Sequence, residues 1–226
     1  QQHIDAGLYP GIEWKIMVDE KSFEGKIGFM NINSQEPIQQ NSIYRIWSMT
    51  KPIVAIAMMQ LIEEKLISLD DPINNFIPEF SNLKVLKNPS SLINEVVDLK
   101  KMPTIRDLFY HTAGFSYNFL ADPVGKKYDD LKLFSASDTT LEEEINILST
   151  CPLLFQPSTD WKYSVSMDVL GRIIEVVTKK SLQNILQERV FIPIGMHETN
   201  FFVPEDKINK IMKSYEFNPL EKKLTE

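Results

Sequence analysis

A serine and a lysine, Ser48 and Lys51, have the clearest potential for chemistry, and they stand at the start of a long apolar segment. A spacing of three places both side chains on one face of a helix, where the lysine can reach the serine hydroxyl. The positive end of a helix dipole beside Ser48 favours negative charge that develops on an attacking oxygen. A desolvated lysine can lose its proton near neutral pH and act as a base. The pair therefore predicts a nucleophilic serine that forms an acyl-enzyme.

The same spacing occurs again at Ser81 and Lys84, so the motif alone is weak evidence. The second copy lies in a proline-punctuated stretch with no long apolar helix behind it, and we interpret it as a solvated loop. For Ser48 the competing interpretation is a helix N-cap followed by a surface lysine. Spacing by itself leaves both interpretations of Ser48 open.

Apolar periodicity indicates the elements that must position this pair. It predicts strands over residues 12–18, 23–30 and 42–46, and helices over residues 48–66, 104–110, 140–148 and 167–190, the last broken near 178–181. The helix over 48–66 is apolar on nearly all sides, which predicts that it is buried. So few strands cannot cover it, because a small sheet leaves one face of such a helix open. We therefore expect more strands, although none is evident after Val190.

Composition excludes several classes of function. The 226 residues are 43% hydrophobic and 24% charged with a formal net charge of −7, as in an ordinary globular protein, and no basic stripe suggests a nucleic-acid partner. The longest apolar run, 52–62, is too short to span a bilayer. Three scattered histidines and one cysteine, Cys151, predict no metal, no cofactor and no disulfide. A cytoplasmic location is slightly favoured, with a periplasmic or secreted one open if an export signal preceded Gln1.

Further segments extend the evidence beyond the first pair. They are residues 44–52 (YRIWSMTKP), 69–73 (LDDPI), 104–108 (TIRDL), 111–114 (HTAG), 157–175, which contains Trp161, Tyr163 and Ser164, and 193–199 (PIGMHET). In this order the segments resemble the serine beta-lactamase and penicillin-binding-protein-like hydrolases, specifically the class C-like branch that includes many esterases. The resemblance spans residues 8–202, and the joint order is far more specific than any single motif.

The resemblance implies that Tyr163 lies beside Ser48 and Lys51 and shares a proton network with them. A phenol acts as a base only where a cation stabilises the phenolate, and Lys51 is the available cation. Whether Lys51 or Tyr163 takes the proton stays open, since coupled groups titrate as a unit. Around these catalytic residues we assign Trp47, Trp161 and Val165 to substrate binding.

Two departures from the family pattern shape the expected activity. Penicillin-handling relatives carry asparagine where this chain has Val165, and valine cannot pair with a ligand amide, which costs about 1 to 3 kcal/mol when the amide is buried. The Tyr-Ser-Val variant is typical of the esterase-like members. The family's third motif, a Lys-Thr-Gly or His-Thr-Gly triplet that supplies part of the oxyanion hole, is expected beyond Glu226. We therefore expect a missing C-terminal segment of the same protein as a partner of this chain.

The resemblance implies an α+β fold in which an antiparallel sheet is flanked by helices and carries an inserted, mainly helical subdomain. We predict an α/β part over 1–66, the helical subdomain over 67–203, and the start of a connection to missing C-terminal strands over 204–226. The predicted function is a carboxylic esterase acting on small-molecule esters or amides. The alternatives are a beta-lactamase or D-Ala-D-Ala carboxypeptidase and, in another class, a non-catalytic relative that binds a ligand or partner.

Overall fold

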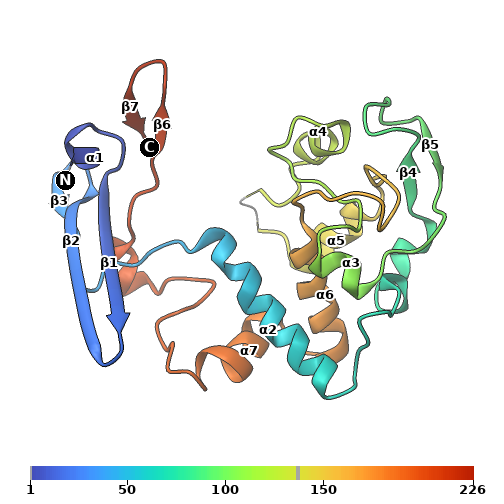
Figure 1. Ribbon diagram of the computed structural model, residues 1–226, viewed down its shortest axis with the longest axis horizontal. Coiled ribbons are helices and arrows are strands. Elements are labelled where there is room, and N and C mark those ends of the chain that lie inside the picture. The colour runs from blue at the N-terminus through green and yellow to red at the C-terminus, as the bar shows by residue number, and fades with distance from the viewer. Residues whose placement is uncertain (1, 136–137) are drawn as a thin grey trace. The chain divides into compact units, whose positions relative to one another are not determined.

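The computed structural model describes residues 2–135 and 138–226 (Figure 1). The chain divides into two compact units, one made of Gln1–Trp47 with Phe201–Glu226 and the other of Ser48–Asn200. This division differs from the predicted domains, which grouped the helix after Ser48 with the N-terminal strands. The reason is packing, since α2 (Thr50–Glu63) lies against α6 (Ser166–Thr178) of the helical unit.

The first unit is built on an antiparallel hairpin. Its elements are α1 (Gln2–Asp5), β1 (Gly11–Val18), β2 (Lys21–Asn31), β3 (Glu36–Pro37), η5 (Glu205–Lys210), β6 (Glu216–Asn218) and β7 (Lys223–Thr225). One sheet has the order β1-β2-β3, and β6 pairs with β7. Trp14 and Gly25 are register partners, and the indole covers the glycine so closely that a Cβ there would lie 2.6 Å from it. The predicted hairpin over 12–18 and 23–30 is confirmed.

Most of the apolar side chains of β1 lie on one face of the hairpin and are largely exposed, and Met17 lies on the other face. Alternate residues Ile12, Trp14, Ile16 and Val18 point to the same side, because side chains in a strand alternate between faces, and they are 38% to 55% exposed. The buried core of this unit is small and consists of Met30, Ile38 and Met212. The unit therefore buries only a small part of its apolar surface.

The second unit holds the main core. Its elements are α2 (Thr50–Glu63), η2 (Ile73–Asn75), η3 (Pro78–Asn82), β4 (Lys84–Leu86), β5 (Val96–Asp98), α3 (Ile105–Phe109), α4 (Pro123–Asp130), α5 (Leu141–Leu148), α6 (Ser166–Thr178), α7 (Leu182–Leu186) and a π turn (Gln187–Phe191). Figure 1 shows α2, α3, α5, α6 and α7 gathered around one centre, with α6 in contact with each of the others. This arrangement fixes α2, and with it the turn that carries Ser48.

The helix after Ser48 is shorter and less buried than predicted. It begins at Thr50 and ends at Glu63, and a 3₁₀ turn (Trp47–Met49) leads into it. Val54, Ala57, Met58 and Leu61 form its buried face, whereas Ile56 and Met59 are 50% and 42% exposed. The prediction of a fully buried helix was therefore wrong, because only the sides toward α6, α7 and the π turn are covered.

Capping residues explain where the next helices begin. Thr104 and Thr140 each form a reciprocal capping box, with Asp107 and Glu143 respectively, so α3 and α5 start one residue later. The predicted helices over 104–110, 140–148 and 167–190 are confirmed, including the break between α6 and α7. The extended piece over 42–46 is reduced to a single bridge between Ile43 and Ile211. In the range 138–226, strands β6 and β7 lie after Val190, where no strand was evident from the sequence.

None of the helices in residues 2–135 and 138–226 is long and apolar enough to span a membrane.

Candidate functional site

Ser48 lies in the 3₁₀ turn that immediately precedes α2, with its side chain exposed. The N-cap of α2 is Met49, and no side chain accepts a hydrogen bond there. The alternative that Ser48 is an N-cap is therefore wrong. Its Oγ instead lies 3.1 Å from Lys51 Nζ and 2.6 Å from the Tyr163 hydroxyl, and it accepts a hydrogen bond from each. A hydroxyl in contact with both an amine and a phenol has its proton partners already in place.

Lys51 lies in the first turn of α2, where its partly buried side chain runs back toward Ser48. Its ammonium is 4.7 Å from the centroid of the Tyr163 ring and 5.3 Å from that of Tyr117. Contact with two aromatic faces stabilises a cation by about 0.5 to 2 kcal/mol each. These contacts hold the ammonium next to the serine rather than in solvent.

Tyr163 belongs to the irregular segment between Pro157 and α6, which brings it next to Ser48 from 115 residues away. Burial acts to raise the pKa of its phenol, but hydrogen bonds with Lys51 and Ser48 and the charge of Lys51 outweigh burial, so the pKa is lowered. A lowered pKa makes the phenolate more accessible near neutral pH. The phenol is thus better suited to accept a proton than a free tyrosine.

Tyr117 and Asp168 complete the surroundings of Lys51, and neither was selected from the sequence. The Tyr117 ring lies 5.4 Å from that of Tyr163 and stacks on Phe119 at 4.8 Å. Asp168, in the first turn of α6, has its carboxyl shielded from water, and this burial raises its pKa to about 6 against the opposing effects of Lys51 and a hydrogen bond from Tyr117. In the sequence, Asp168 shares its helix face with Arg172 and Glu175, four and seven residues later, so the pattern does not indicate that its carboxyl is buried.

Replacing Asp168 with asparagine should stabilise the fold at alkaline pH. Because the pKa is raised from 3.8 to about 6, the folded state binds the proton more tightly, so the stability gained by protonation is present below about pH 4 and lost as pH rises through 6. One pKa unit corresponds to about 1.4 kcal/mol, so the gain at pH 8 should reach at most about 3 kcal/mol. Urea unfolding at pH 4 and pH 8 measures this gain. The exposed Asp130→Asn change is the control, and equal pH slopes for both variants and the parent would contradict the expectation.

The three residues predicted to bind substrate lie in different environments. Trp47 precedes Ser48 directly and is 72% exposed, with a left-handed φ of 44°. Trp161 is 61% exposed and stands two residues before Tyr163. Val165 is fully buried, and its N–H donates to the Ser116 carbonyl at 3.1 Å. The two tryptophans are accessible to a ligand, whereas contact between Val165 and a ligand requires movement of the residues around it.

The second serine-lysine pair has a different environment. Ser81 lies in η3, and Lys84, the first residue of β4, forms an exposed ion pair with Asp98 on the neighbouring strand. The Lys84 amine is therefore paired with the Asp98 carboxylate and not with Ser81. The sequence predicted a solvated loop here. Both residues are exposed as predicted, but they lie in a 3₁₀ turn and a strand rather than in a loop.

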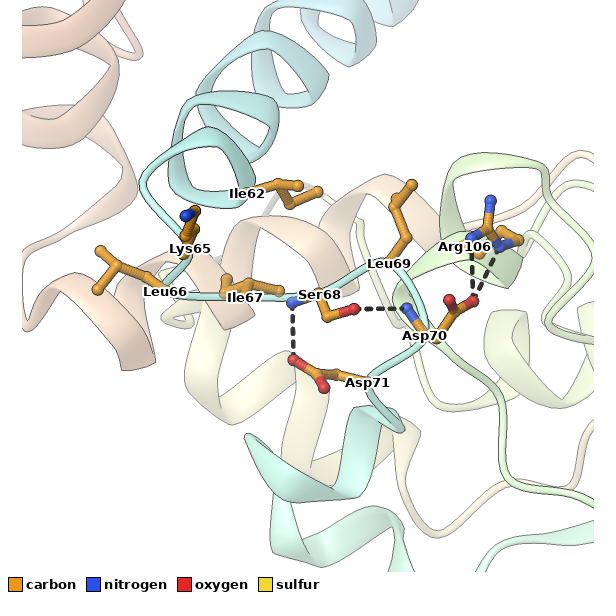
Figure 2. A pocket seen from close by; sticks show the side chains of 9 residues that line it. All are labelled: Ile62, Lys65, Leu66, Ile67, Ser68, Leu69, Asp70, Asp71 and Arg106. Carbon is orange, nitrogen blue, oxygen red and sulfur yellow. Dashed lines mark hydrogen bonds and ion pairs between the residues drawn. The ribbon is translucent and has the colours of Figure 1, made fainter.

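A hollow of about 490 Å³ opens at the far end of α2, about 20 Å along the helix from Lys51 by its rise per residue. Figure 2 shows that it is lined by the end of α2 and the following loop, with the Asp70 carboxylate facing the Arg106 guanidinium. These two groups are ion-paired at 3.0 Å, and Asp71 accepts the Ser68 N–H. The hollow contains none of the serine, lysine or tyrosine groups described above. Within residues 2–135 and 138–226, no cluster of three or more potential metal ligands occurs.

The chain is similar in sequence and in structure to several known proteins. Protein Rv1367c of Mycobacterium tuberculosis is 33% identical over 213 residues, which cover 93% of this chain and 52% of that protein. Esterase EstB of Burkholderia gladioli is 30% identical over 79% of this chain and 43% of its own length. The structure of EstCE1, described as a hydrolase with promiscuous acyltransferase activity, matches 99% of this chain and 56% of that one with a TM-score of 0.82 and 25% identity.

The chain thus spans about half the length of the relatives it matches. The predicted fold class, of the beta-lactamase and transpeptidase type, is confirmed by the structural match. The sequence model of the beta-lactamase family matches residues 1–223, which is almost the whole sequence. The chain therefore belongs to the beta-lactamase family, as the order of its motifs had indicated.

Proposed function

We propose that the protein is a carboxylic ester hydrolase that forms an acyl-enzyme on Ser48. The observation that carries this proposal is the contact of Ser48 Oγ with both Lys51 Nζ and the Tyr163 hydroxyl, at 3.1 and 2.6 Å. Nucleophilic catalysis by serine needs a proton acceptor within this range. The esterase name of EstB and the hydrolase description of EstCE1 support the same class of reaction.

In the first half of the reaction, one member of the Lys51 and Tyr163 pair is deprotonated and accepts the proton of Ser48. The Ser48 oxygen attacks the ester carbonyl carbon, and the carbonyl oxygen becomes an oxyanion. The carbonyl re-forms as the bond to the alkoxy group breaks, and the pair returns the proton to the departing alcohol. The acyl group is left on Ser48 as an ester.

In the second half, water replaces the alcohol. The same pair accepts a proton from the water, whose oxygen attacks the acyl carbon. Collapse of this second intermediate breaks the bond to Ser48, which regains the proton as the carboxylic acid leaves. Because the pair ends each cycle in its starting state, no external acid or base is consumed.

An ester is favoured over a beta-lactam or peptide because of Val165. The position two residues after Tyr163 offers neither a donor nor an acceptor, and the valine side chain is fully buried. Movement of the surrounding residues that brings an amide substrate against Val165 would leave the amide without a hydrogen-bond partner, whereas an ester, which has no N–H, loses less. Small to medium carboxylic esters are the proposed substrates.

Labelling of the full-length protein with a fluorophosphonate tests the proposal. The expected result is one mass adduct that peptide mapping assigns to Ser48, with Ser81 unmodified as the internal control. Hydrolysis of a chromogenic ester faster than of a chromogenic cephalosporin is expected from the environment of Val165. Absence of any adduct on the full-length protein would instead support a binding protein without catalysis.

A further inference from the structure

His111 lies where α3 has just ended and has an unusual backbone conformation. Its φ is 57°, in the left-handed region, which costs energy for a residue other than glycine, although histidine is among the residue types more often found there. The conformation directs its carbonyl at the segment that carries Tyr163, where it accepts the Lys162 N–H at 3.0 Å. Strain of this kind persists only where surrounding contacts hold it, and here the contacts lead to the candidate site.

The imidazole makes a second contact on the other side of Tyr163. Its Nδ1 accepts the Ser164 N–H at 3.2 Å and lies 3.1 Å from Ser164 Oγ. A backbone N–H always donates, so Nδ1 must be unprotonated and the ring proton must lie on Nε2. Ser164 is 1% exposed, and its Oγ also contacts Ser166 Oγ at 2.8 Å. A charged imidazole would lose this acceptor in a place that water does not reach.

The ring itself packs beside the catalytic phenol. The centroids of His111 and Tyr163 are 5.1 Å apart with the planes tilted by 39°, and Trp161 meets the imidazole edge at 6.4 Å. His111 therefore contacts residues 161, 162, 163 and 164 in turn. With the residues before and after it fixed by hydrogen bonds and its ring face covered, Tyr163 has little freedom to leave Ser48.

The charges around His111 also favour its neutral form. Burial lowers the pKa of the imidazole, and the positive charge of Lys51 lowers it further. The titratable and charged groups around this segment are Lys51 of α2, Asp107 of α3, Tyr117 and Asp122 before α4, Lys162 and Tyr163 of the following segment, and Asp168 of α6. Of these, Asp168 is the one whose titration, near pH 6, falls in the same acidic range as an imidazole.

We propose that neutral His111 is a positioning residue that holds the phenol of Tyr163 at Ser48 by binding the backbone on both sides of it. This inference rests on the proposed function, in which Tyr163 handles the proton of Ser48. It assigns no proton transfer to the imidazole, which acts only through Tyr163. Protonation of His111 at low pH removes the Nδ1 acceptor and should release the segment.

The test compares two replacements that both tolerate a left-handed φ, so that neither fails through backbone strain. His111→Asn keeps an acceptor oxygen close to the position of Nδ1 but cannot titrate, whereas His111→Gly removes the acceptor and the ring. In the full-length protein, the rate constant for fluorophosphonate labelling of Ser48 at pH 8 should fall about 10- to 100-fold in His111→Gly and stay within about threefold in His111→Asn, since misplacement by about 1 Å can cost about 100-fold. An unchanged rate in His111→Gly overturns the inference.

A pH profile and a spectrum separate positioning from a merely structural role. Below neutral pH the labelling rate of the parent should fall more steeply than that of His111→Asn. Any effect of Asp168 titration on the labelling rate is present in both proteins and therefore does not account for the difference. The Ser164 amide resonance should shift with the titration of His111 in the parent and stay constant in His111→Asn. The exposed His197→Asn change is the matched control and should follow the parent in both measurements.

The two proposals fail in different ways. A parent protein that is never labelled at Ser48 contradicts the proposed function, and the Ser164 resonance then still reports on the contact with His111. Normal labelling of the parent, together with a Ser164 amide resonance that does not shift as His111 titrates, contradicts the positioning role alone.

Discussion

Replacing Ser48 with alanine should lower kcat/KM for ester hydrolysis by about 10⁴-fold or more. The change removes the oxygen that forms the acyl-enzyme, and loss of a nucleophile from a unit of cooperating residues removes nearly all the rate enhancement that the unit provides. Its effect on folding should be small, because the Ser48 side chain is exposed and does not cap α2. Steady-state kinetics with a chromogenic ester measure the loss, and a urea unfolding curve checks that the fold is kept.

Ser81→Ala is the matched control for this change. Ser81 has the same spacing to a lysine, but Lys84 is paired with Asp98 and the serine lies in a 3₁₀ turn before a strand. Its replacement should leave kcat/KM within about twofold of the parent, as for a surface substitution. Equal losses from Ser48→Ala and Ser81→Ala would show that neither serine is a specific nucleophile.

The approach of Ser48, Lys51 and Tyr163 could be predicted only in part from local pattern. The spacing of three residues places Ser48 and Lys51 together by helix geometry alone. Tyr163 is 115 residues away in the chain, and no periodicity links it to Ser48. It was predicted because the ordered motifs resemble one family, and the structure brings its hydroxyl to 2.6 Å from Ser48.

Tyr117 and Asp168 were missed for different reasons. Tyr117 stands in a stretch without regular structure, between α3 and α4, where a pattern of residues predicts no direction for a side chain. Asp168 lies in a helix that was predicted correctly, but one acidic residue in a first turn is ordinarily a solvated end that favours the helix dipole. Only the packing of α6 against α2 shows that this carboxyl is shielded and near Lys51.

The longest elements were predictable and most of the short ones were not. The hairpin β1-β2 and the helices α5 and α6 carry enough residues for a period of 2 or 3.6 to be recognised. The exceptions are α3, which was predicted although it has five residues, and α4, which was missed although it has eight. Strands β4 to β7 have three residues each, too few for alternation to differ from chance, and their pairing depends on contacts between segments. The exposed face of α2 was mistaken for core because apolar composition does not reveal which face has a partner.

Replacement of Lys51 by methionine should lower kcat/KM about 10³-fold and move the rising limb of the pH profile to higher pH. Methionine keeps most of the length of the side chain but removes both the amine and its charge. Because hydrogen bonding and the charge of Lys51 lower the pKa of Tyr163, that pKa should rise when the lysine is lost, and fewer molecules will carry the phenolate at a given pH. Rates measured from pH 6 to 10 with a chromogenic ester test this shift, and Lys84→Met is the control.

Tyr163→Phe is the second single variant of a double-mutant cycle with Lys51→Met. It should lower kcat/KM by about 10²- to 10⁴-fold, the usual contribution of a general acid-base group. If Lys51 and Tyr163 hold one shared proton, the double variant should have a kcat/KM only slightly below that of the less active single variant. The reason is that residues acting as a unit have non-additive effects. Losses that simply multiply would show two independent roles. A shared proton is favoured by geometry, since the Lys51 ammonium lies 4.7 Å from the Tyr163 ring and both groups contact the same Ser48 oxygen.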